Sequence, residues 1–175
     1  HDIISAWIKS TRASDVQASI YYLAAMLEAG EDARFIARRM IVLASEDIGN
    51  ADPQALQVAV AAAQAVEHVG LPEARINLAQ AAVYLARAPK SNASYMALNR
   101  AQELVRERGI LTPPGELRSA AYAGARKLGR GNGYLYPHEN PEGFAFDCLP
   151  EPIRGKVLFT PSGNGVEQAK PRGAN

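Results

Sequence analysis

The sequence predicts an all-α domain that ends in an irregular arm rich in glycine and proline. Up to residue 110, apolar residues recur at helical spacing, and residues that start or stop helices separate the periodic stretches. Beyond residue 110, glycine and proline become frequent and the helical period fades. Hydrophobic residues make up 47% of the 175 residues, which is enough to bury the core of one sizeable domain.

The first three predicted helices follow one another with short connections. The first has an apolar face made by Ile4, Trp7, Ile8 and Thr11. Ser14 or Asp15 can cap the second helix, and Gly30 ends it. Asp32 can cap the third helix, which we expect to run to Ile48.

A helical hairpin is predicted over residues 52–88. Asp52 can accept hydrogen bonds from the free N–H groups of the first arm, and Pro53 suits the first helical position. Gly70 tolerates the conformation that follows a helix end, so it closes the first arm. Pro72 then opens the second arm, and Pro89 stops it.

The first arm of this hairpin is apolar on nearly every side, which is typical of a helix that is buried on every side. Polar residues interrupt it too often for a membrane span, which needs about 20 apolar residues. A chain of this length cannot easily surround a helix with its own residues, so neighbouring copies are expected to cover part of it. The candidates for that interface are Leu56, Val60, Val66 and Val69.

The rest of the chain is predicted to be less regular. Ser91 or Asn92 can cap a further helix, which ends at Arg108. We expect a helical core over residues 1–110 and, within the same domain, an arm over residues 111–175 with one short helix at 117–128. The tail from about residue 162 is expected to be disordered or loosely attached.

One polar cluster falls on an apolar face. Glu46 and Asp47 lie at the end of the third predicted helix, where the helix dipole disfavours negative charge. Asp47 also continues the apolar stripe of that helix, so its carboxylate needs partners from elsewhere, either backbone N–H groups or an arginine of another helix. A buried cap or ion pair is favoured over a metal site or a catalytic acid. The cluster comprises Arg38, Arg39, Glu46 and Asp47.

A second polar cluster combines basic residues with tyrosines in the predicted arm. Such a combination can contact phosphates and stack on bases, although a solvated basic turn is the simpler interpretation. The residues that could contact DNA or a partner protein are Arg118, Arg126, Lys127, Arg130, Tyr134 and Tyr136.

Several kinds of catalytic and cofactor motif are absent from the sequence. It contains no GxxxxGK[ST] phosphate loop, no GxGxxG, no HExxH and no GxSxG. The three histidines are scattered, and the one cysteine, Cys148, cannot form a disulfide within the chain. We therefore expect no catalytic residues, no metal site and no cofactor in this chain. The net charge of +1 gives little long-range attraction to nucleic acid or to a membrane.

The order of several linked motifs resembles the C-terminal part of the replication-associated recombination protein A family, also called RarA or MgsA, whose eukaryotic relative is the Werner helicase-interacting protein. The resemblance covers the chain from His1 to about Thr160. It rests on ISAWIKSTRASD, YYLAAMLEAGED, RFIARRMIVLASEDIGNADPQAL, VGLPEARINLAQAAVYLARAPKSN, LRSAAYAGARKLG and GYLYPHENPEG.

The resemblance implies the oligomerisation domain of a clamp-loader-like AAA+ ATPase that acts at stalled replication forks in the cytoplasm, associated with the nucleoid. ATP and Mg²⁺ would belong to a nucleotide-binding part that precedes this region in the family. The implied partners are other copies of the chain in a homotetramer, DNA at forks and single-strand-binding protein, with no membrane. Family members often read RGSDPD where this chain has RASDVQ, and a QYLP-like run where it has DCLP.

The sequence therefore predicts a homotetramerisation domain that is not itself an enzyme. The alternative is a module that docks onto DNA or a partner protein through residues 118–138. An unrecognised small enzyme is the weakest hypothesis.

Overall fold

A computed structural model describes residues 1–119, 124, 129 and 131–169 of the chain. These residues form helices, short helical turns and loops, with no strand in the part of the chain described. The predicted all-α class with an irregular arm is confirmed. The chain divides into two compact units, which are described separately. Unit 1 comprises His1–Ala97 and Phe159–Ala169, and unit 2 comprises Leu98–Leu158 over its described residues.

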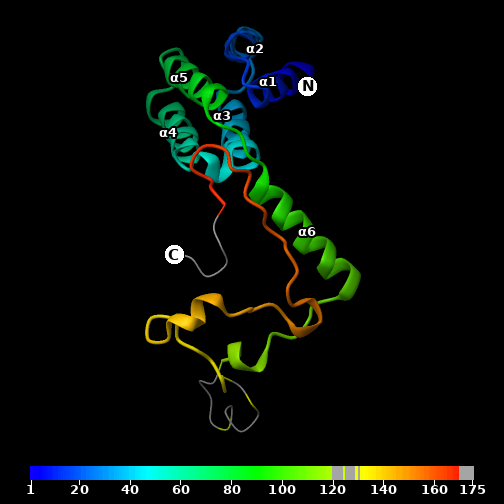
Figure 1. Cartoon of the computed structure of the whole chain (residues 1–175). Coiled ribbons are helices and arrows are strands. Elements are labelled where there is room, and N and C mark those ends of the chain that lie inside the picture. The colour runs from blue at the N-terminus through cyan, green and yellow to red at the C-terminus, as the bar shows by residue number, and fades with distance from the viewer. Residues whose placement is uncertain (120–123, 125–128, 130, 170–175) are drawn as a thin grey trace. The chain divides into compact units, whose positions relative to one another are not determined.

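Unit 1 is built from consecutive helices, and a further helix begins in it (Figure 1). Each begins and ends close to the start and stop signals of the sequence. Their bounds are α1, Asp2–Arg12; α2, Val16–Glu28; α3, Ala33–Leu43; α4, Gln54–Val69; α5, Ala74–Arg87; and α6, Ala93–Arg108.

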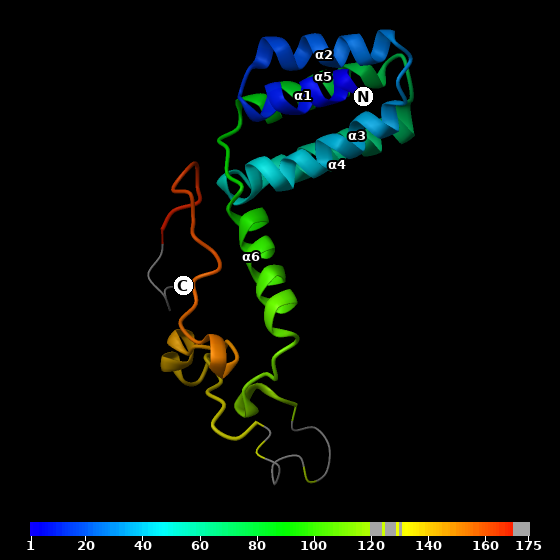
Figure 2. The ribbon, with the colours of Figure 1, turned by 90° about the vertical axis from the view of Figure 1, so that its right-hand side faces the viewer.

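Helix α5 is the central element of unit 1. It packs against α1 and α2 on one side and against α3 and α4 on the other, as Figure 2 shows. Small residues dominate its buried positions, which lets the neighbouring helices approach closely. These positions are Ala74, Leu78, Ala81, Ala82, Leu85 and Ala86. The rest of the core comes mainly from α1 to α4, including the fully buried Trp7, Ile36 and Met40.

Most predicted helix ends are found within a residue or two of their expected positions. Asp15 caps α2 by accepting a hydrogen bond from the Ala18 N–H at 3.0 Å, and Asp32 caps α3 in the same way. Gly70 follows α4 with a φ of 73°, which a residue with a side chain rarely adopts. The second arm of the hairpin, α5, begins at Ala74 rather than at Pro72.

The third predicted helix is not uniform. Its α-helical part ends at Leu43, and a π-helical segment, η1, covers Ala44–Ile48 before the short 3-10 helix η2 at Gly49–Ala51. The wider turn of η1 carries Glu46 and Asp47. The spacing of apolar residues could not indicate the change from α-helix to π-helix. Leu43, Asp47 and Ile48 are all buried, and that burial fits either kind of turn.

Unit 2 has little regular structure beyond α6. Short 3-10 helices follow it, and they are η3, Gly115–Leu117; η5, Pro141–Ala145; and η6, Glu151–Ile153. Asp147 organises one loop, since its two carboxylate oxygens accept hydrogen bonds from the Leu149 and Gly155 N–H groups. Most of the short helix expected at 117–128 lies outside the described residues.

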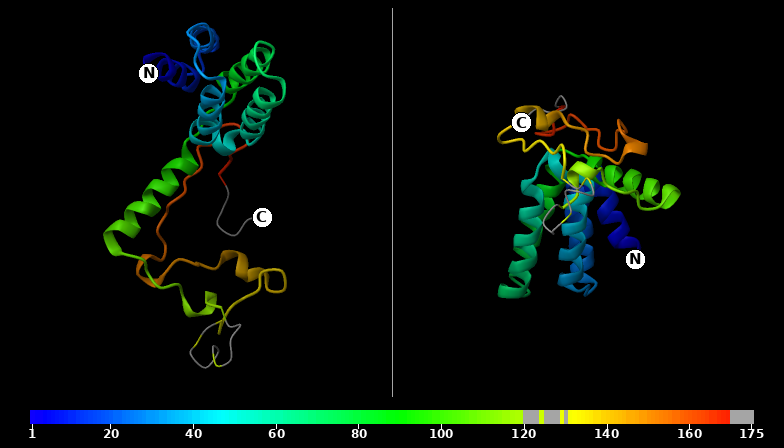
Figure 3. Two further views of the ribbon diagram at one scale, coloured as in Figure 1. Left: turned by 180° about the vertical axis from the view of Figure 1, so that it is seen from behind. Right: turned by 90° about the horizontal axis from the view of Figure 1, so that it is seen from below.

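The last described segment, Phe159–Ala169, returns to unit 1, and we call it the C-terminal strap. Seen from behind in Figure 3, the strap lies against the region around η2, and the Val166 N–H donates a 2.9 Å hydrogen bond to the Ala51 carbonyl. The expectation of a loose tail from residue 162 is therefore corrected for residues 162–169. We expected a division between residues 110 and 111. The boundary between the two compact units instead falls within α6, between residues 97 and 98.

Within the described part of the chain, no helix combines the length and the apolar character needed to cross a membrane.

Candidate functional site

A buried carboxylate lies where α1 meets η1. Asp47, whose side chain is 8% exposed, accepts a 2.8 Å hydrogen bond from Arg12 Nε. The same guanidinium donates a second hydrogen bond, from Nη2 to Glu46 Oε2, at 3.1 Å. These two carboxylates raise the pKa of Arg12, the hydrogen bond to Asp47 being the largest cause. Of the two kinds of partner expected for Asp47, the structure shows the arginine of another helix, Arg12.

The predicted polar cluster is only partly assembled. Arg38 is exposed and Arg39 half-buried on α3, and neither makes an ion pair with Glu46 or Asp47 among the described residues. By helical spacing, Arg38 lies on the side of α3 opposite its buried stripe, and Arg39 lies at the flank of that stripe. Asp47 Oδ2 is buried without a hydrogen-bond partner in the part of the chain described.

Lys90 closes the end of α5. Its Nζ donates hydrogen bonds to the carbonyls of Ala86 at 3.0 Å and Ala88 at 2.7 Å, and to Ser14 Oγ at 2.9 Å. The last carbonyls of a helix favour a cation in this place. Burial lowers the pKa of Lys90, while the charge of Asp47 opposes that shift.

A second buried carboxylate, Glu167, joins the C-terminal strap to the start of α6. Glu167 Oε1 accepts hydrogen bonds from Ser91 Oγ and from the Ser162 N–H, both at 2.7 Å. Ser91 Oγ in turn accepts the Ala93 N–H at 3.1 Å, so it caps α6 as the sequence predicted. A polar pocket of about 270 Å³ between these groups is lined by Arg12, Asp47, Lys90, Ser91, Asn92, Ser162 and Asn164.

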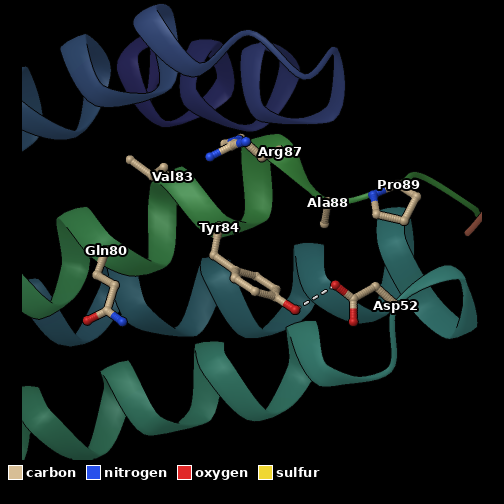
Figure 4. Close-up of a pocket in the computed structure, with 7 residues that line it drawn as sticks. All are labelled: Asp52, Gln80, Val83, Tyr84, Arg87, Ala88 and Pro89. Atoms are coloured by element: carbon tan, nitrogen blue, oxygen red, sulfur yellow. Dashed lines mark hydrogen bonds between the residues drawn. The ribbon is translucent and has the colours of Figure 1, made fainter.

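A further hollow in unit 1 lies beside α5 and measures about 450 Å³ (Figure 4). Tyr84 projects from α5 toward the start of α4, where its hydroxyl donates a 2.6 Å hydrogen bond to Asp52 Oδ2. Asp52 Oδ1 accepts the Gln54 N–H, which is the cap that the sequence predicted. Arg87 points to another side of α5. Both oxygens of Asp52 therefore serve the fold.

The structure separates the four interface candidates of α4. Leu56, Val60 and Val69 are exposed, at 41%, 37% and 55%. Val66 is 7% exposed and belongs to the core stripe Ala55, Ala59, Ala62 and Val66. Val66 is therefore corrected to a core residue, since it already packs inside its own chain.

The basic cluster of the arm is only partly described. Arg118 donates a hydrogen bond from Nε to the Pro113 carbonyl at 3.1 Å, and Tyr134 and Tyr136 are about half exposed. Tyr136 makes an edge contact with His138, whose ring makes another with Phe144. Arg126, Lys127 and Arg130 lie outside the described residues.

Polar side chains that line these two hollows make hydrogen bonds within the fold. Among the described residues, no three side chains of His, Cys, Asp or Glu come together in a way that could hold a metal ion. The buried carboxylates instead connect elements that lie far apart in the sequence. The polar contacts made by Arg12, Tyr84 and Glu167 were not identified from the sequence. These contacts join residues 32 to 76 positions apart, and no local sequence pattern indicates such a contact.

Most of the sequence matches a known family. The family model for the C-terminal part of the MgsA AAA+ ATPases matches residues 13–173. An uncharacterised AAA domain-containing protein of Mycobacterium tuberculosis is 50% identical over 169 residues, which are 96% of this chain and 37% of that protein. Replication-associated recombination protein A of Bacillus subtilis is 44% identical over 166 residues, which are 94% of this chain and 39% of that protein.

The protein of the same name from Escherichia coli K12 is 41% identical over 169 residues, which are 95% of this chain and 38% of that protein. The chain thus spans well under half of the length of these relatives. The class of domain that this match defines is the C-terminal domain of an AAA+ ATPase. The chain belongs to the C-terminal domain family of the MgsA AAA+ ATPases, and its relatives include proteins of replication-associated recombination.

Proposed function

We propose that this chain is the homotetramerisation domain of an AAA+ ATPase that maintains replication forks and acts in recombination in the cytoplasm. On this proposal, the chain has no enzymatic activity of its own. ATP and Mg²⁺ bind to another part of the longer protein, which the tetramer gathers around DNA. The names of the relatives support a role in replication-associated recombination. The absence of a phosphate loop from the sequence supports the assignment of ATP binding to another part of the longer protein.

The observation that carries the proposal is an apolar surface that remains after unit 1 has formed its core. On α4 one stripe is buried, yet Leu56 and Val60 on the adjacent stripe stay exposed. On α3, Val42 is exposed in the same way at 43%. Exposed apolar residues that gather in one place commonly mark a protein–protein contact.

An ion pair supports the placement of these residues near one another. Arg34 Nε of α3 lies 2.7 Å from Glu67 Oε1 of α4, so the outer faces of the two antiparallel helices meet there. Two helical turns further along each helix, in opposite directions, lie Val42 and Val60. Leu56 follows one turn beyond Val60. We call Val42, Leu56 and Val60 the α3–α4 patch.

A second apolar surface lies on unit 2. Leu98 and Val105 are exposed on α6, and Ile110 just beyond it is 91% exposed. A tetramer with dihedral symmetry needs two different self-complementary faces, whereas a ring of four needs one interface between unlike faces. The α3–α4 patch and the α6 residues therefore supply the two surfaces that a dihedral tetramer requires.

Sedimentation velocity of two double variants tests this proposal. Leu56→Glu with Val60→Glu places charges in the α3–α4 patch, and Leu98→Glu with Val105→Glu does the same on α6. In a dihedral tetramer each double variant should stop at a dimer, since the other face still pairs, and combining both should give a monomer.

Tyr21→Glu serves as the matched control, because Tyr21 is exposed on α2 and belongs to neither surface. It should leave the mass unchanged. Circular dichroism should show the same helix content in all variants. If both double variants keep the mass of the unchanged chain, the proposed surfaces do not form the assembly.

The exposure of Tyr134 and Tyr136 supports a second candidate function, docking onto single-stranded DNA or a partner protein. Exposed aromatic rings beside basic residues can stack on bases while the cations contact phosphates, and each stacked base contributes about 1–3 kcal/mol. On this hypothesis Arg118, Arg126, Lys127 and Arg130 supply the cations.

Titration of the chain with a fluorescent single-stranded oligonucleotide at several salt concentrations separates the two functions. If docking is the function, Arg126→Ala with Lys127→Ala and Arg130→Ala should flatten the salt dependence by about 0.7–0.9 per lost contact. Tyr134→Ala with Tyr136→Ala should weaken binding at every salt concentration. If the chain binds weakly and neither change matters, the docking hypothesis is wrong.

A further inference from the structure

The chain crosses between its two compact units twice. The first crossing is between Ala97 and Leu98, within α6, and the second is between Leu158 and Phe159, where the C-terminal strap begins. Unit 1 therefore contains the beginning of α6 as well as the whole described strap.

Within unit 1, hydrogen bonds tie the strap to the chain just before α6. Glu167 accepts the Ser91 hydroxyl, and Ser91 Oγ caps α6 through the Ala93 N–H. The Asn164 amide Nδ2 donates to the Lys90 carbonyl at 2.9 Å. The strap thus holds the residues that orient the first turn of α6, across 74 to 76 residues of sequence.

The attachment of the strap is polar rather than apolar. Its large apolar residues, Phe159 and Val166, are exposed, and none of its residues belongs to the hydrophobic core of the helices. Glu167 is its buried side chain among the described residues, and its second oxygen, Oε2, is buried there without a hydrogen-bond partner. Opening the strap would break hydrogen bonds but leave the core of α1 to α5 intact, which is the pattern of a locally unfolding segment.

One glycine lets the strap fit so closely. Gly165 has a φ of 55°, and a Cβ there would overlap the Ala51 carbonyl oxygen and lie 2.7 Å from Pro89 Cγ. Ala51 belongs to η2, so the obstacle is backbone that cannot swing aside. Gly163, in the same strap, also has a positive φ of 79°, but a Cβ there would meet nothing within 4 Å.

We infer that the C-terminal strap is a releasable clasp, locked by Glu167 and Gly165, that controls how freely unit 2 moves relative to unit 1. When the clasp is closed, the strap is fastened to the chain just before α6. When it opens, unit 2 remains joined through α6 alone, and the first turn of α6 loses the support of its cap. The helices of unit 1 stay folded in both states.

Hydrogen–deuterium exchange of the full chain tests whether the clasp opens by itself. In the unchanged protein, the N–H groups of Ser162 and Val166 should exchange faster than those in the middle of α4 and α5. Gly165→Ala should speed exchange in the strap and at Ala93 by about tenfold or more, while leaving α4 and α5 within about twofold. Gly163→Ala, which adds a methyl group in open space, should have a much smaller effect.

Distances between the units test the control of unit 2. One dye can be placed on the exposed native Cys148 of unit 2 and another on Glu28→Cys at the exposed end of α2. Labelled chains are diluted into unlabelled ones, so that each assembly contains one labelled copy. Gly165→Ala should broaden the distribution of transfer efficiencies, and Gly163→Ala, which adds backbone strain but no clash, should broaden it much less.

Glu167→Ala provides a second way to open the clasp without touching the backbone fit. It should reproduce both effects of Gly165→Ala. If the strap exchanges only together with α4, the strap is an inseparable part of the body and the inference is wrong. It is equally wrong if either opened variant frees the strap but the distance distribution keeps its width, or if Gly163→Ala matches Gly165→Ala.

Discussion

Arg12 Nε donates a 2.8 Å hydrogen bond to Asp47 Oδ1, and this contact fastens the end of α1 to the π-helical turn after α3 across 35 residues of sequence. The arginine side chain is 44% exposed, whereas the aspartate is almost fully buried. Most of the cost of breaking the pair therefore falls on Asp47, because a buried carboxylate without its partner has no access to water.

We expect Asp47→Ala to lower the free energy of unfolding by about 1.5–3 kcal/mol, because it removes the charge-assisted hydrogen bond between Arg12 and Asp47. Glu46→Ala is the matched control on the same guanidinium. Its side chain is 31% exposed, so this change should cost less than about 1 kcal/mol. Thermal melts followed by circular dichroism measure both. An unchanged midpoint for Asp47→Ala would contradict the role given to this pair.

Tyr84 and Asp52 offer a titration that can be read directly. The hydrogen bond to Asp52, with burial and the charge of Asp52, raises the pKa of Tyr84 above its ordinary value of 10.0. A raised tyrosine pKa stabilises the fold below pH 10 and loses that contribution as the pH rises through the folded-state pKa. The ultraviolet absorbance of tyrosinate, compared with that of Tyr84→Phe, should therefore show one residue that ionises late.

Asp52→Asn tests the cause of this late ionisation. Asparagine can still cap α4, but it no longer places a negative charge beside the tyrosine hydroxyl. The late residue should then ionise at a lower pH than in the unchanged protein. If the titration stays the same, Asp52 is not what holds the proton on Tyr84.

Glu167 makes the clasp sensitive to acid. Burial acts to raise the pKa of its carboxyl, but the hydrogen bonds from Ser162 and Ser91 outweigh burial and lower the pKa below its ordinary value of 4.5. A lowered carboxylate pKa stabilises the closed clasp above pH 4.5, and that contribution disappears as the pH falls through the folded-state pKa. Arg12, Asp47 and Lys90 line the neighbouring polar pocket and share this environment.

Limited proteolysis with an acid-active protease measures that loss. As the pH falls from 5 to 3, cleavage within the strap should accelerate. Glu167→Gln should raise the cleavage rate at pH 5 toward the rate that the unchanged protein shows at pH 3. Cleavage within α4 reports the unfolding of unit 1 and serves as the internal reference. Strap cleavage that rises only together with α4 cleavage would contradict a local effect of Glu167.

The helices could be predicted from the sequence because their signals are local. Asp15, Asp32 and Asp52 each cap the helix that follows within a few residues, and Gly70 ends α4 where it stands. The helical spacing of apolar residues also placed Asp47 correctly on a buried face. Such signals depend on neighbours in the sequence, so one chain suffices to recognise them.

The polar connections could not be predicted, because their partners lie far away in the chain. Nothing near Glu167 indicates that Ser91 donates a hydrogen bond to its carboxylate, and a stretch rich in glycine and polar residues normally indicates a loose tail. Val66 was assigned to an interface for a related reason. On a helix that is apolar all round, the sequence does not tell which stripe faces the core of the same chain and which faces another copy.

The most direct test of the proposed function is the mass of the unmodified chain in solution. Sedimentation equilibrium at micromolar concentration should give four times the chain mass of 18.8 kDa. The apolar residues of the α3–α4 patch and of α6 would then be covered by other copies. A mass of 18.8 kDa that persists over the whole concentration range would contradict the assignment of this domain to assembly.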